Sequence, residues 1–525
     1  MTASERMPTP EIATPSRTET VHDYVVVGGG TAGSLLAARL SEDPDVSVAL
    51  LEWGPDDRNE NRARYLRRWA EMLEGTYDLD YRCVPQERGN SGIRQARMRI
   101  LGGCSNANTM ITWRPLASDL REWAALGASG WEPETILPYY DRIEVPIHPV
   151  GVADRNPFVA EVVAAAAVAL DVPIVDAWND GRLDERAAGS GFFEVGYDPE
   201  TNVRGATSIH YLHPVMDHRQ NLTVVTGVRA TRVLVEDGRA VGVEVADAAG
   251  RRSVTARREV VLCAGAIDTP RLLQLSGIGP RDVLKAAGVD LVVELPGVGE
   301  NLQDHAEGLA VWEVADTTPT TSASGWDAGA MFSLGGDPTQ PDVLMHFPVE
   351  PVVDHPRALG VAFPERIAAI APNVAKPASR GRVWIESTDV NAPPLIDYRY
   401  FTDPDGHDER VLVEGVRAAR RIAKAAPLSA HVLREVFPGP EVQSDDALGA
   451  ALRAVHQTVY HVSGTCRMGA ADDPLAVTDP QLRVRGLDGL RIVDASVFPT
   501  VTAVNPVGTV MTVAERAADL IRRGD

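Results

Sequence analysis

Residues 23–40 read D-Y-V-V-V-G-G-G-T-A-G-S-L-L-A-A-R-L, and the architecture of the chain can be inferred outward from them. The apolar run at residues 23–27 predicts a short buried strand, and residues 34–40 predict a helix. A second strand is expected at residues 46–51, ending at Glu52. The order of strand, G-x-G-x-x-G turn, helix, strand and acidic residue is typical of a dinucleotide-binding domain.

Each glycine of this turn has a physical role. Gly28 allows the tight turn, Gly30 lets the backbone approach a pyrophosphate, and Gly33 lets the helix pack closely against the strand. The helix N-terminus supplies an anion site, and Glu52 can accept hydrogen bonds from a ribose. The motif predicts dinucleotide binding but does not by itself distinguish FAD from NAD.

Composition limits the classes of protein to consider. The chain has 525 residues, of which 44% are hydrophobic and 24% charged, so we expect two intertwined domains. Its net charge of −22 argues against a nucleic-acid or anionic-membrane surface and mildly favours the approach of cationic substrates.

Cysteine usage and the terminal sequence point to a cytoplasmic protein. The four cysteines form no C-x-x-C pair and no cluster with histidine, so we expect neither a disulfide framework nor a metal site. Residues 1–19 are polar and rich in proline and threonine, and they are expected to form a disordered tail. The longest apolar run, residues 162–170, is too short to span a bilayer, so no membrane partner is expected.

The middle of the chain alternates between nucleotide-fold patterns and insertions. Residues 222–259 alternate apolar and polar side chains around a turn, which predicts an antiparallel meander. Residues 259–263 predict a buried strand, and Thr269 followed by Pro270 predicts the start of a helix. Residues 153–189 and 304–453 read as two insertions, with strands at 343–347 and 382–386 and helices at 162–170 and 411–425.

Three further segments carry candidate ligand contacts. In residues 97–113, Gly102 and Gly103 precede small polar residues, which suggests backbone pressed against a flat ligand; a turn rich in helix-capping residues is the alternative. Residues 456–469 contain two histidines, and residues 494–511 follow shortly after. Taken alone, His461 reads as a structural histidine at a strand end, so its role depends on the rest of the chain.

The chain resembles the glucose–methanol–choline (GMC) oxidoreductase family. Residues 265–279 (G-A-I-D-T-P-R-L-L-Q-L-S-G-I-G) resemble one family signature, and residues 97–113 resemble the other. Cys104 is a departure, because it stands where a small glycine, serine or threonine is usual. The stretches that resemble the choline-oxidising branch of the family are residues 101–105, 302–307, 400–408 and 458–461.

The resemblance implies a mixed α/β fold. A Rossmann-like FAD-binding domain is expected from residues 20–155, 202–305 and 459–525. A substrate-binding domain built on a six-stranded antiparallel sheet is expected from residues 156–201 and 306–458. A homodimer is one expected assembly.

The resemblance also assigns roles to single residues. His461 matches the catalytic histidine and Asn505 its partner, and we expect them to meet over the flavin ring. There His461 would take the hydroxyl proton or stabilise the alkoxide, while an Asn505 N–H holds the substrate oxygen. Glu307 matches the acid that faces the trimethylammonium group in the choline-oxidising branch; a surface or hinge carboxylate paired with arginine is the alternative. Other residues expected around the substrate, whose aromatic faces would attract an organic cation, are Trp69, Trp326, Tyr460 and His346.

The expected cofactor is FAD. Ala107 stands where the choline-oxidising branch has the histidine that links covalently to the flavin, so we expect noncovalent binding. Residues 348–370 also differ, which leaves the shape of the substrate cage open, and Cys466 is expected to pack beside the site without acting as a nucleophile. The residues expected to bind the cofactor are Gly28, Gly30, Thr31, Ala32, Gly33, Glu52, Leu101, Gly103, Asn106, Asn108, Thr109, Met110, Val228, Ala264, Asp494, Ala495 and Pro506.

These features predict an FAD-dependent alcohol oxidase. A primary alcohol would be oxidised to the aldehyde by hydride transfer to flavin N5, and O2 would accept the electrons and form H2O2. One alternative is a dehydrogenase with another electron acceptor, and another is a hydroxynitrile-lyase-like member that uses FAD structurally. A flavin-bound scaffold without turnover is a further alternative, which the intact His461 disfavours.

Overall fold

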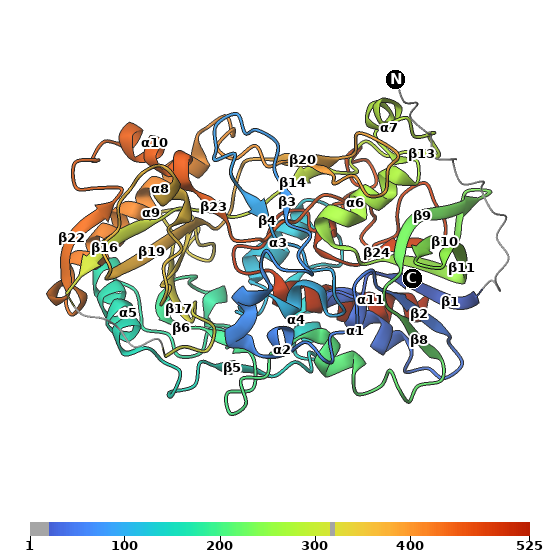
Figure 1. Cartoon of the computed structure of the whole chain (residues 1–525), viewed down its shortest axis with the longest axis horizontal. Helices are drawn as coiled ribbons and strands as arrows, with labels where there is room; N and C mark the ends of the chain where they lie inside the picture. Colours follow the sequence, from blue (N-terminus) through green and yellow to red (C-terminus); the bar gives the residue numbers. More distant parts are fainter. Residues whose placement is uncertain (1–19, 316–320, 525) are drawn as a thin grey trace, which may run out of the picture.

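Two sheets, one in each lobe of Figure 1, organise the part of the chain that the computed structural model describes, residues 20–315 and 321–524. The tail expected at residues 1–19 lies outside the described residues. All strands of the first sheet come from the ranges assigned to cofactor binding, and all strands of the second come from the ranges assigned to substrate binding. That division of the chain into two domains therefore remains our working proposal.

The first sheet has seven strands in the order β8-β2-β1-β11-β10-β9, with β24 paired to β11. Its β1, helix α1 and β2 follow one another as the sequence predicts, and β1 pairs in parallel with both β2 and β11. Helix α1 packs against helix α11 beside this sheet (Figure 1). The bounds are β1 (Thr20–Val27), α1 (Thr31–Leu40), β2 (Val48–Leu51), β8 (Leu222–Val225), β9 (Arg229–Glu236), β10 (Arg239–Asp247), β11 (Gly250–Leu262), β24 (Leu490–Ile492) and α11 (Val507–Arg523).

The strand expected at residues 259–263 is the second half of β11. The first half of β11 pairs antiparallel with β10 and so completes the expected meander. The second half runs between β1 and β24, parallel to both. Strand β11 thus belongs both to the antiparallel meander and to the parallel nucleotide-binding strands, because its partners change along its length.

The helix expected to start at Thr269 begins earlier, at Gly265, and α6 spans Gly265–Leu275. The Asp494 carboxylate accepts hydrogen bonds from the Gly265 N–H (2.9 Å) and from Thr269 Oγ1 (2.6 Å), so a distant side chain stabilises the first turn. Pro270 lacks the N–H that would bond to the Ala266 carbonyl, and Thr465 Oγ1 donates to that carbonyl instead (2.6 Å). The expectation was wrong because both stabilising groups lie about 200 residues away along the chain.

The second sheet has six strands in the antiparallel order β22-β16-β19-β18-β17-β6, as expected, and two short strands attached to it. Helices α5 and α9 pack on it and on each other (Figure 1). The bounds are α5 (Pro157–Leu170), β6 (Gly189–Phe192), β15 (Ala306–Glu307), β16 (Ala310–Val314), β17 (Ala328–Phe332), β18 (Val343–His346), β19 (Ile367–Val374), α9 (His407–Lys424), β22 (Val432–Phe437) and β23 (Gln457–Thr458).

The short strands join the two lobes. Strand β15 pairs with β19 and with β23, so Glu307 lies opposite Gln457 in the chain segment that leads to His461. The strand expected at residues 382–386 is β20 (Gly381–Trp384), which forms a separate three-stranded sheet with β14 (Glu300–Leu302) and β21 (Leu395–Asp397). Other helices of the chain are α2 (Asn61–Arg64), α3 (Ala117–Ala125), α4 (Pro133–Tyr140), α7 (Arg281–Ala287), α8 (Asp354–Ala358) and α10 (Asp445–Val455).

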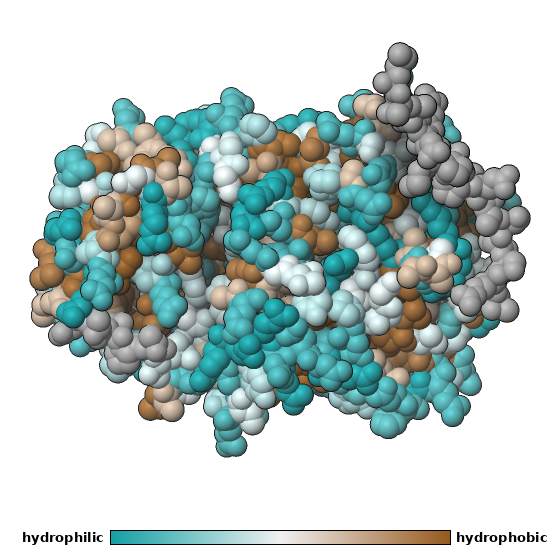
Figure 2. Space-filling view, viewed as in Figure 1, coloured by the Kyte–Doolittle hydropathy of each residue, from teal (hydrophilic) through white to brown (hydrophobic). Residues whose placement is uncertain are grey.

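The face drawn in Figure 2 is mixed in character, with hydrophobic residues in separate groups among hydrophilic ones over both lobes. Among residues 20–315 and 321–524, no helix is both long and apolar enough to cross a membrane.

Candidate active site

A cavity of about 1270 Å³ extends between the two lobes. Most of the residues that the sequence predicts to bind cofactor or substrate line this cavity. They come from segments that lie hundreds of residues apart in the chain. Those on the wall are Gly28, Gly30, Thr31, Ala32, Glu52, Trp69, Gly103, Asn108, Thr109, Met110, Val228, Ala264, Glu307, Trp326, His346, Tyr460, His461, Asp494, Ala495, Asn505 and Pro506. Gly33, Leu101 and Asn106 lie behind the wall.

One end of the cavity is shaped for a dinucleotide. A Cβ on Gly33 would lie 1.9 Å from the Gly28 carbonyl oxygen, so the helix can approach the strand only with glycine there. A Cβ on Gly30 would meet nothing closer than 3.9 Å, which leaves room for a ligand over the turn. The Glu52 carboxylate accepts hydrogen bonds from the N–H groups of Gly29 (2.8 Å) and Gly54 (2.6 Å). Burial raises the pKa of Glu52 to about 7.

A second segment runs along the cavity from this end to the other. The Gly102 N–H donates to the Gly29 carbonyl (2.7 Å), and Gly103 packs directly on Gly30. At the far end of the segment, Trp113 Nε1 donates to Asn505 Oδ1 (2.9 Å). Residues 102–113 therefore connect the glycine turn with the candidate catalytic residue, and the expectation from Gly102 and Gly103 that this backbone follows a flat ligand stays a prediction.

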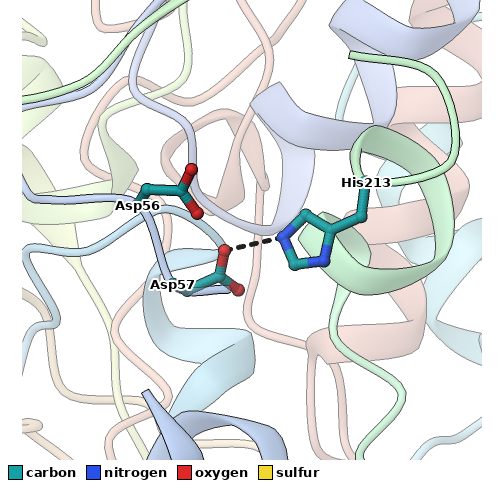
Figure 3. A group of neighbouring side chains, drawn as sticks. All are labelled: Asp56, Asp57 and His213. Carbon is teal, nitrogen blue, oxygen red and sulfur yellow. Dashed lines mark hydrogen bonds and ion pairs between the residues drawn. The ribbon is translucent and has the colours of Figure 1, made fainter. Parts of the chain in front are cut away.

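Asn106 supports this segment by donating to Asp57, which is drawn with Asp56 and His213 in Figure 3. Asp57 accepts hydrogen bonds from Asn106 Nδ2 (3.0 Å) and Ser208 Oγ (2.6 Å), and its other oxygen lies 2.8 Å from His213 Nε2. Asp56, Asp57 and His213 are close enough to hold a metal ion. However, Asp57 already has three partners and Asp56 is paired with a neighbouring arginine, so hydrogen bonding accounts for this arrangement.

The other end of the cavity contains a pair of histidines whose contacts define their tautomers. His305 Nε2 lies 2.9 Å from the Thr502 carbonyl, which can only accept, so this nitrogen carries the proton. In the neutral ring Nδ1 of His305 is then an acceptor, and it lies 2.9 Å from Nδ1 of His461. His461 therefore donates through Nδ1, and its Nε2 carries the lone pair of the ring.

The surroundings keep both rings neutral. Burial, followed by the charge of Lys376, lowers the pKa of His305 to about 3. Burial, followed by His305 and His346, holds the pKa of His461 well below its ordinary value. A neutral imidazole with a lone pair on Nε2 is a suitable proton acceptor.

Asn505 faces this lone pair. Its Nδ2 lies 3.3 Å from His461 Nε2, and the Trp113 hydrogen bond to Oδ1 fixes which way the amide points. The two side chains meet as expected, and their meeting over a flavin ring stays a prediction. A substrate oxygen placed between them would meet one proton acceptor and one N–H donor.

The backbone of His461 is held by a buried acid. Asp304 accepts a hydrogen bond from the His461 N–H (2.7 Å), and its other oxygen accepts from the hydroxyls of Thr458 and Tyr400. Burial raises the pKa of Asp304 to about 6, against the effect of these hydrogen bonds. Asp304 thus fixes the backbone of His461, while His305, its neighbour in sequence, fixes the ring.

Glu307 lies inside the protein and not on its surface. It is 1% exposed, and its two oxygens lie 2.8 Å from Gln457 Nε2 and 3.0 Å from His346 Nδ1. Trp326 packs edge-on against His346, with ring centroids 5.7 Å apart. The alternative of an exposed carboxylate paired with arginine does not fit, since its hydrogen-bond partners are an amide and an imidazole.

Two aromatic residues complete this part of the wall. Trp69 Nε1 donates to the Ser324 carbonyl (2.7 Å), which joins the cofactor side to the second insertion. Tyr460 has a φ of +65°, a conformation that is uncommon for a residue other than glycine, and its carbonyl accepts from Arg97 Nη2 (3.0 Å). Both line the cavity with Glu307.

The cysteines near the cavity differ in environment. Cys466 is fully buried, and burial holds the pKa of its thiol well above the ordinary value, which fits packing and not nucleophilic attack. Its neighbour Arg467 is paired with Asp473. Cys104 lines the cavity close to Ala107, whose methyl group offers no atom for a covalent bond to a flavin.

Several contacts were not predicted. His305 contacts His461, and Gln457 contacts Glu307, but the sequence assigned neither His305 nor Gln457 a role of its own. Arg97 lines the cavity and was named only as the start of a segment. The signal available in the sequence was proximity, because His305 lies two residues from Glu307 and Gln457 four residues from His461.

Comparison with known proteins places this geometry in a family. Two family models, both described as GMC oxidoreductase, match residues 22–307 and 377–514. The chain is 42% identical over 519 residues to a choline oxidase of Arthrobacter globiformis, covering 95% of this chain and 94% of that protein. It is 32% identical over 544 residues to an alcohol dehydrogenase (acceptor) of Pseudomonas putida, covering 96% of each. The crystal structure of pyridoxine 4-oxidase from Mesorbium loti matches with a TM-score of 0.89 and 31% identity, covering 96% of this chain and 99% of that one.

Proposed function

The chain belongs to the GMC oxidoreductase family, and from this premise we propose that it oxidises a primary alcohol to the aldehyde with FAD and O2. Members of this family act on CH–OH donors and depend on FAD. The single observation that carries the proposal is the hydrogen-bonded series Thr502–His305–His461–Asn505, which leaves an unprotonated imidazole nitrogen facing an N–H donor.

The protein's part in the reaction is to hold and move one proton. His461 Nε2 accepts the proton of the substrate hydroxyl, while Asn505 Nδ2 donates a hydrogen bond to the developing alkoxide. His461 then carries a positive charge, and its Nδ1–H remains hydrogen-bonded to His305. An oriented donor of this kind typically lowers the barrier by about 3 kcal/mol.

The residues present fit an FAD molecule. The glycine turn, Glu52 and the segment from Gly102 to Trp113 would hold it along the cavity. Bound FAD would supply the oxidant, which takes a hydride from the alcohol carbon at N5 and passes the electrons to O2 to give H2O2. We propose noncovalent binding, because Ala107 stands at the position of the linking histidine.

We propose further that the alcohol carries a positive charge. Glu307, Trp69 and Trp326 all line the cavity, and Trp326 packs on His346, whose Nδ1 lies 3.0 Å from the Glu307 carboxylate. A carboxylate and aromatic faces attract an organic cation by Coulomb and cation–π interactions. His461 and Glu307 lie on connected segments, since β15 pairs with β23, so an alcohol with its charge at the opposite end would reach both.

Anaerobic mixing tests the reaction. The FAD-loaded protein is mixed with primary alcohols, and the flavin absorbance is followed. Bleaching by an alcohol supports oxidation, whereas a flavin that stays yellow with every alcohol, including aryl and aliphatic ones, contradicts it. Admission of air then restores the colour within seconds for an oxidase, and slow recovery favours a dehydrogenase with another acceptor.

A matched pair of alcohols tests the charge. Choline and 3,3-dimethyl-1-butanol have nearly the same shape, but only choline is charged. If Glu307 faces a cation, choline has the higher kcat/KM by about 30-fold or more in the unchanged protein. Glu307→Gln should remove most of this difference, and equal kcat/KM values for the two alcohols in the unchanged protein would rule out a cationic substrate.

A further inference from the structure

Arg204 is a buried cation without a counter-ion. Its side chain is 0% exposed, and none of the ion pairs among the described residues includes it. One terminal nitrogen donates to the Ser105 carbonyl (3.0 Å), the Asn108 carbonyl (2.6 Å) and Asn108 Oδ1 (3.2 Å). Nε and the other terminal nitrogen are buried with no hydrogen-bond partner among the described residues.

This environment is unfavourable for a charged group. Burial lowers the pKa of Arg204 to about 9, and no acidic residue opposes that effect. Other buried arginines have a compensating contact: Arg271 is paired with Asp268 and Arg491 with Glu259, while Arg516, which has no ion pair among the described residues, lies over the ring of Trp131. A buried charge is expected to be paired, so an isolated one calls for a ligand that supplies the missing negative charge.

The position of Arg204 indicates that ligand. Its hydrogen bonds end on residues 105–108, in the middle of the segment that connects the glycine turn to Trp113. Asn108 lines the cavity, so a single residue separates the guanidinium group from the space assigned to FAD. The diphosphate of FAD is an anion, and Gly103, in the same segment, packs on Gly30 of the turn that would bind it, so its charge would act on Arg204 through an interior of low polarity.

We propose that Arg204 is the buried counter-charge of the cofactor. It holds the Ser105–Asn108 backbone against the cavity, and its positive charge is balanced only when FAD is bound. The proposal rests on FAD binding by this chain. It assigns to Arg204 a positioning and electrostatic role without direct contact with substrate.

Two substitutions separate charge from packing. Arg204→Gln removes the charge, and Arg204→Lys keeps it while losing the forked geometry. Arg516→Gln is the matched control, because Arg516 is also buried, but it donates to the Gly130 carbonyl and packs on Trp131, and neither of these residues lines the cavity. The dissociation constant of FAD is measured by titrating each apoprotein with FAD, and unfolding temperatures are recorded with and without FAD.

If the charge of Arg204 balances that of FAD, its removal should affect the stability of the apoprotein and of the FAD-bound protein differently. Arg204→Gln should weaken FAD binding by about 10- to 100-fold, as expected for a lost interaction of a buried charge. The apoprotein should unfold at the same or a higher temperature, because an uncompensated charge is gone, and only the FAD-bound form should lose stability. Arg204→Lys should stay within about 5-fold of the parent affinity, and Arg516→Gln within about 2-fold.

Several outcomes would overturn the proposal. These are an Arg204→Gln protein that binds FAD as tightly as the parent, or one whose apo and FAD-bound forms lose stability equally. If Arg204→Gln does not fold, the proposal is overturned by a folded Arg204→Lys protein that binds FAD more than about 30-fold more weakly than the parent. A parent protein that binds FAD but oxidises no alcohol contradicts the proposed function alone, whereas a parent that binds no FAD contradicts both.

Discussion

Replacement of His305 by leucine should slow the reaction although His305 touches neither alcohol nor cofactor in the scheme above. In the parent protein His461 donates through Nδ1 to His305, and this leaves Nε2 free to accept a proton. Leucine offers no acceptor. The Nδ1–H of His461 would then be left inside the protein without a partner, and the ring would favour the tautomer with its proton on Nε2.

The size of the effect follows from the lost hydrogen bond. An unsatisfied donor inside a protein costs about 1–3 kcal/mol, so the reactive tautomer becomes less favourable by about 2 kcal/mol. This corresponds to about a 30-fold lower rate of flavin reduction. His461→Ala removes the proton acceptor altogether, and its rate should fall further, by at least about 100-fold.

The assay is the rate of flavin bleaching after anaerobic mixing with a saturating alcohol, measured by stopped flow. His305→Gln is the rescue variant, because its amide offers one acceptor for His461 and one donor for the Thr502 carbonyl, and it should stay within about 5-fold of the parent. His456→Gln is the control at another buried histidine, which accepts from the Asn90 N–H and does not line the cavity. The reasoning is refuted if His305→Leu reduces the flavin at the parent rate, or if His305→Gln is as slow as His305→Leu.

Three further predictions concern stability and the cofactor. Burial raises the pKa of Asp304 to about 6, so the folded protein holds this proton up to a higher pH than the unfolded chain does. The free energy of unfolding of the parent protein should therefore fall as the pH rises through about 4 to 6, and Asp304→Asn should lack about 2 kcal/mol of that fall when urea unfolding at pH 4.5 and pH 7 is compared. A Cβ on Gly103 would lie 2.7 Å from Gly30 Cα, whereas one on Gly238 would meet nothing within 4 Å, and both residues have positive φ. Gly103→Ala should therefore weaken FAD binding by at least about 10-fold in a titration, while Gly238→Ala costs only about 1 kcal/mol of stability and leaves FAD binding unchanged. Acid precipitation should release the flavin into the supernatant, and colour that stays with the pellet would contradict noncovalent binding.

The elements predicted best are those whose signal is local. Residues 23–52 carry a strand, a glycine turn, a helix and a strand in succession, and each is specified by its own side chains. The start of α6 was placed one turn late because its stabilising groups, Asp494 and Thr465, come from another part of the chain. Local capping rules cannot detect a cap that only folding brings into place.

The same distinction applies to the site. His461 and Asn505 could be nominated because their segments resemble those of the GMC family, although His461 taken alone reads as a structural histidine. The role of His305 could not, since it depends on a carbonyl at Thr502 and a ring at His461, which lie 197 and 156 residues away along the chain. Arg204 gives no local signal at all: an arginine in a polar stretch is usually exposed, and only the structure shows it buried and unpaired.

Residues 304–307 link these observations. Asp304 holds the backbone of His461, His305 fixes its tautomer, and Glu307 provides the cavity carboxylate that we propose faces the substrate. Because β15 contains Glu307 and pairs with the strand that precedes His461, a shift of this segment would move all three contacts together. Groups that act as a unit lose their effects non-additively. The rate of flavin reduction in a His305→Leu, Asp304→Asn double variant should therefore be only slightly lower than in the slower of the two single variants. If the fold-loss of the double variant instead equals the product of the two single fold-losses, the backbone and the ring of His461 are held independently.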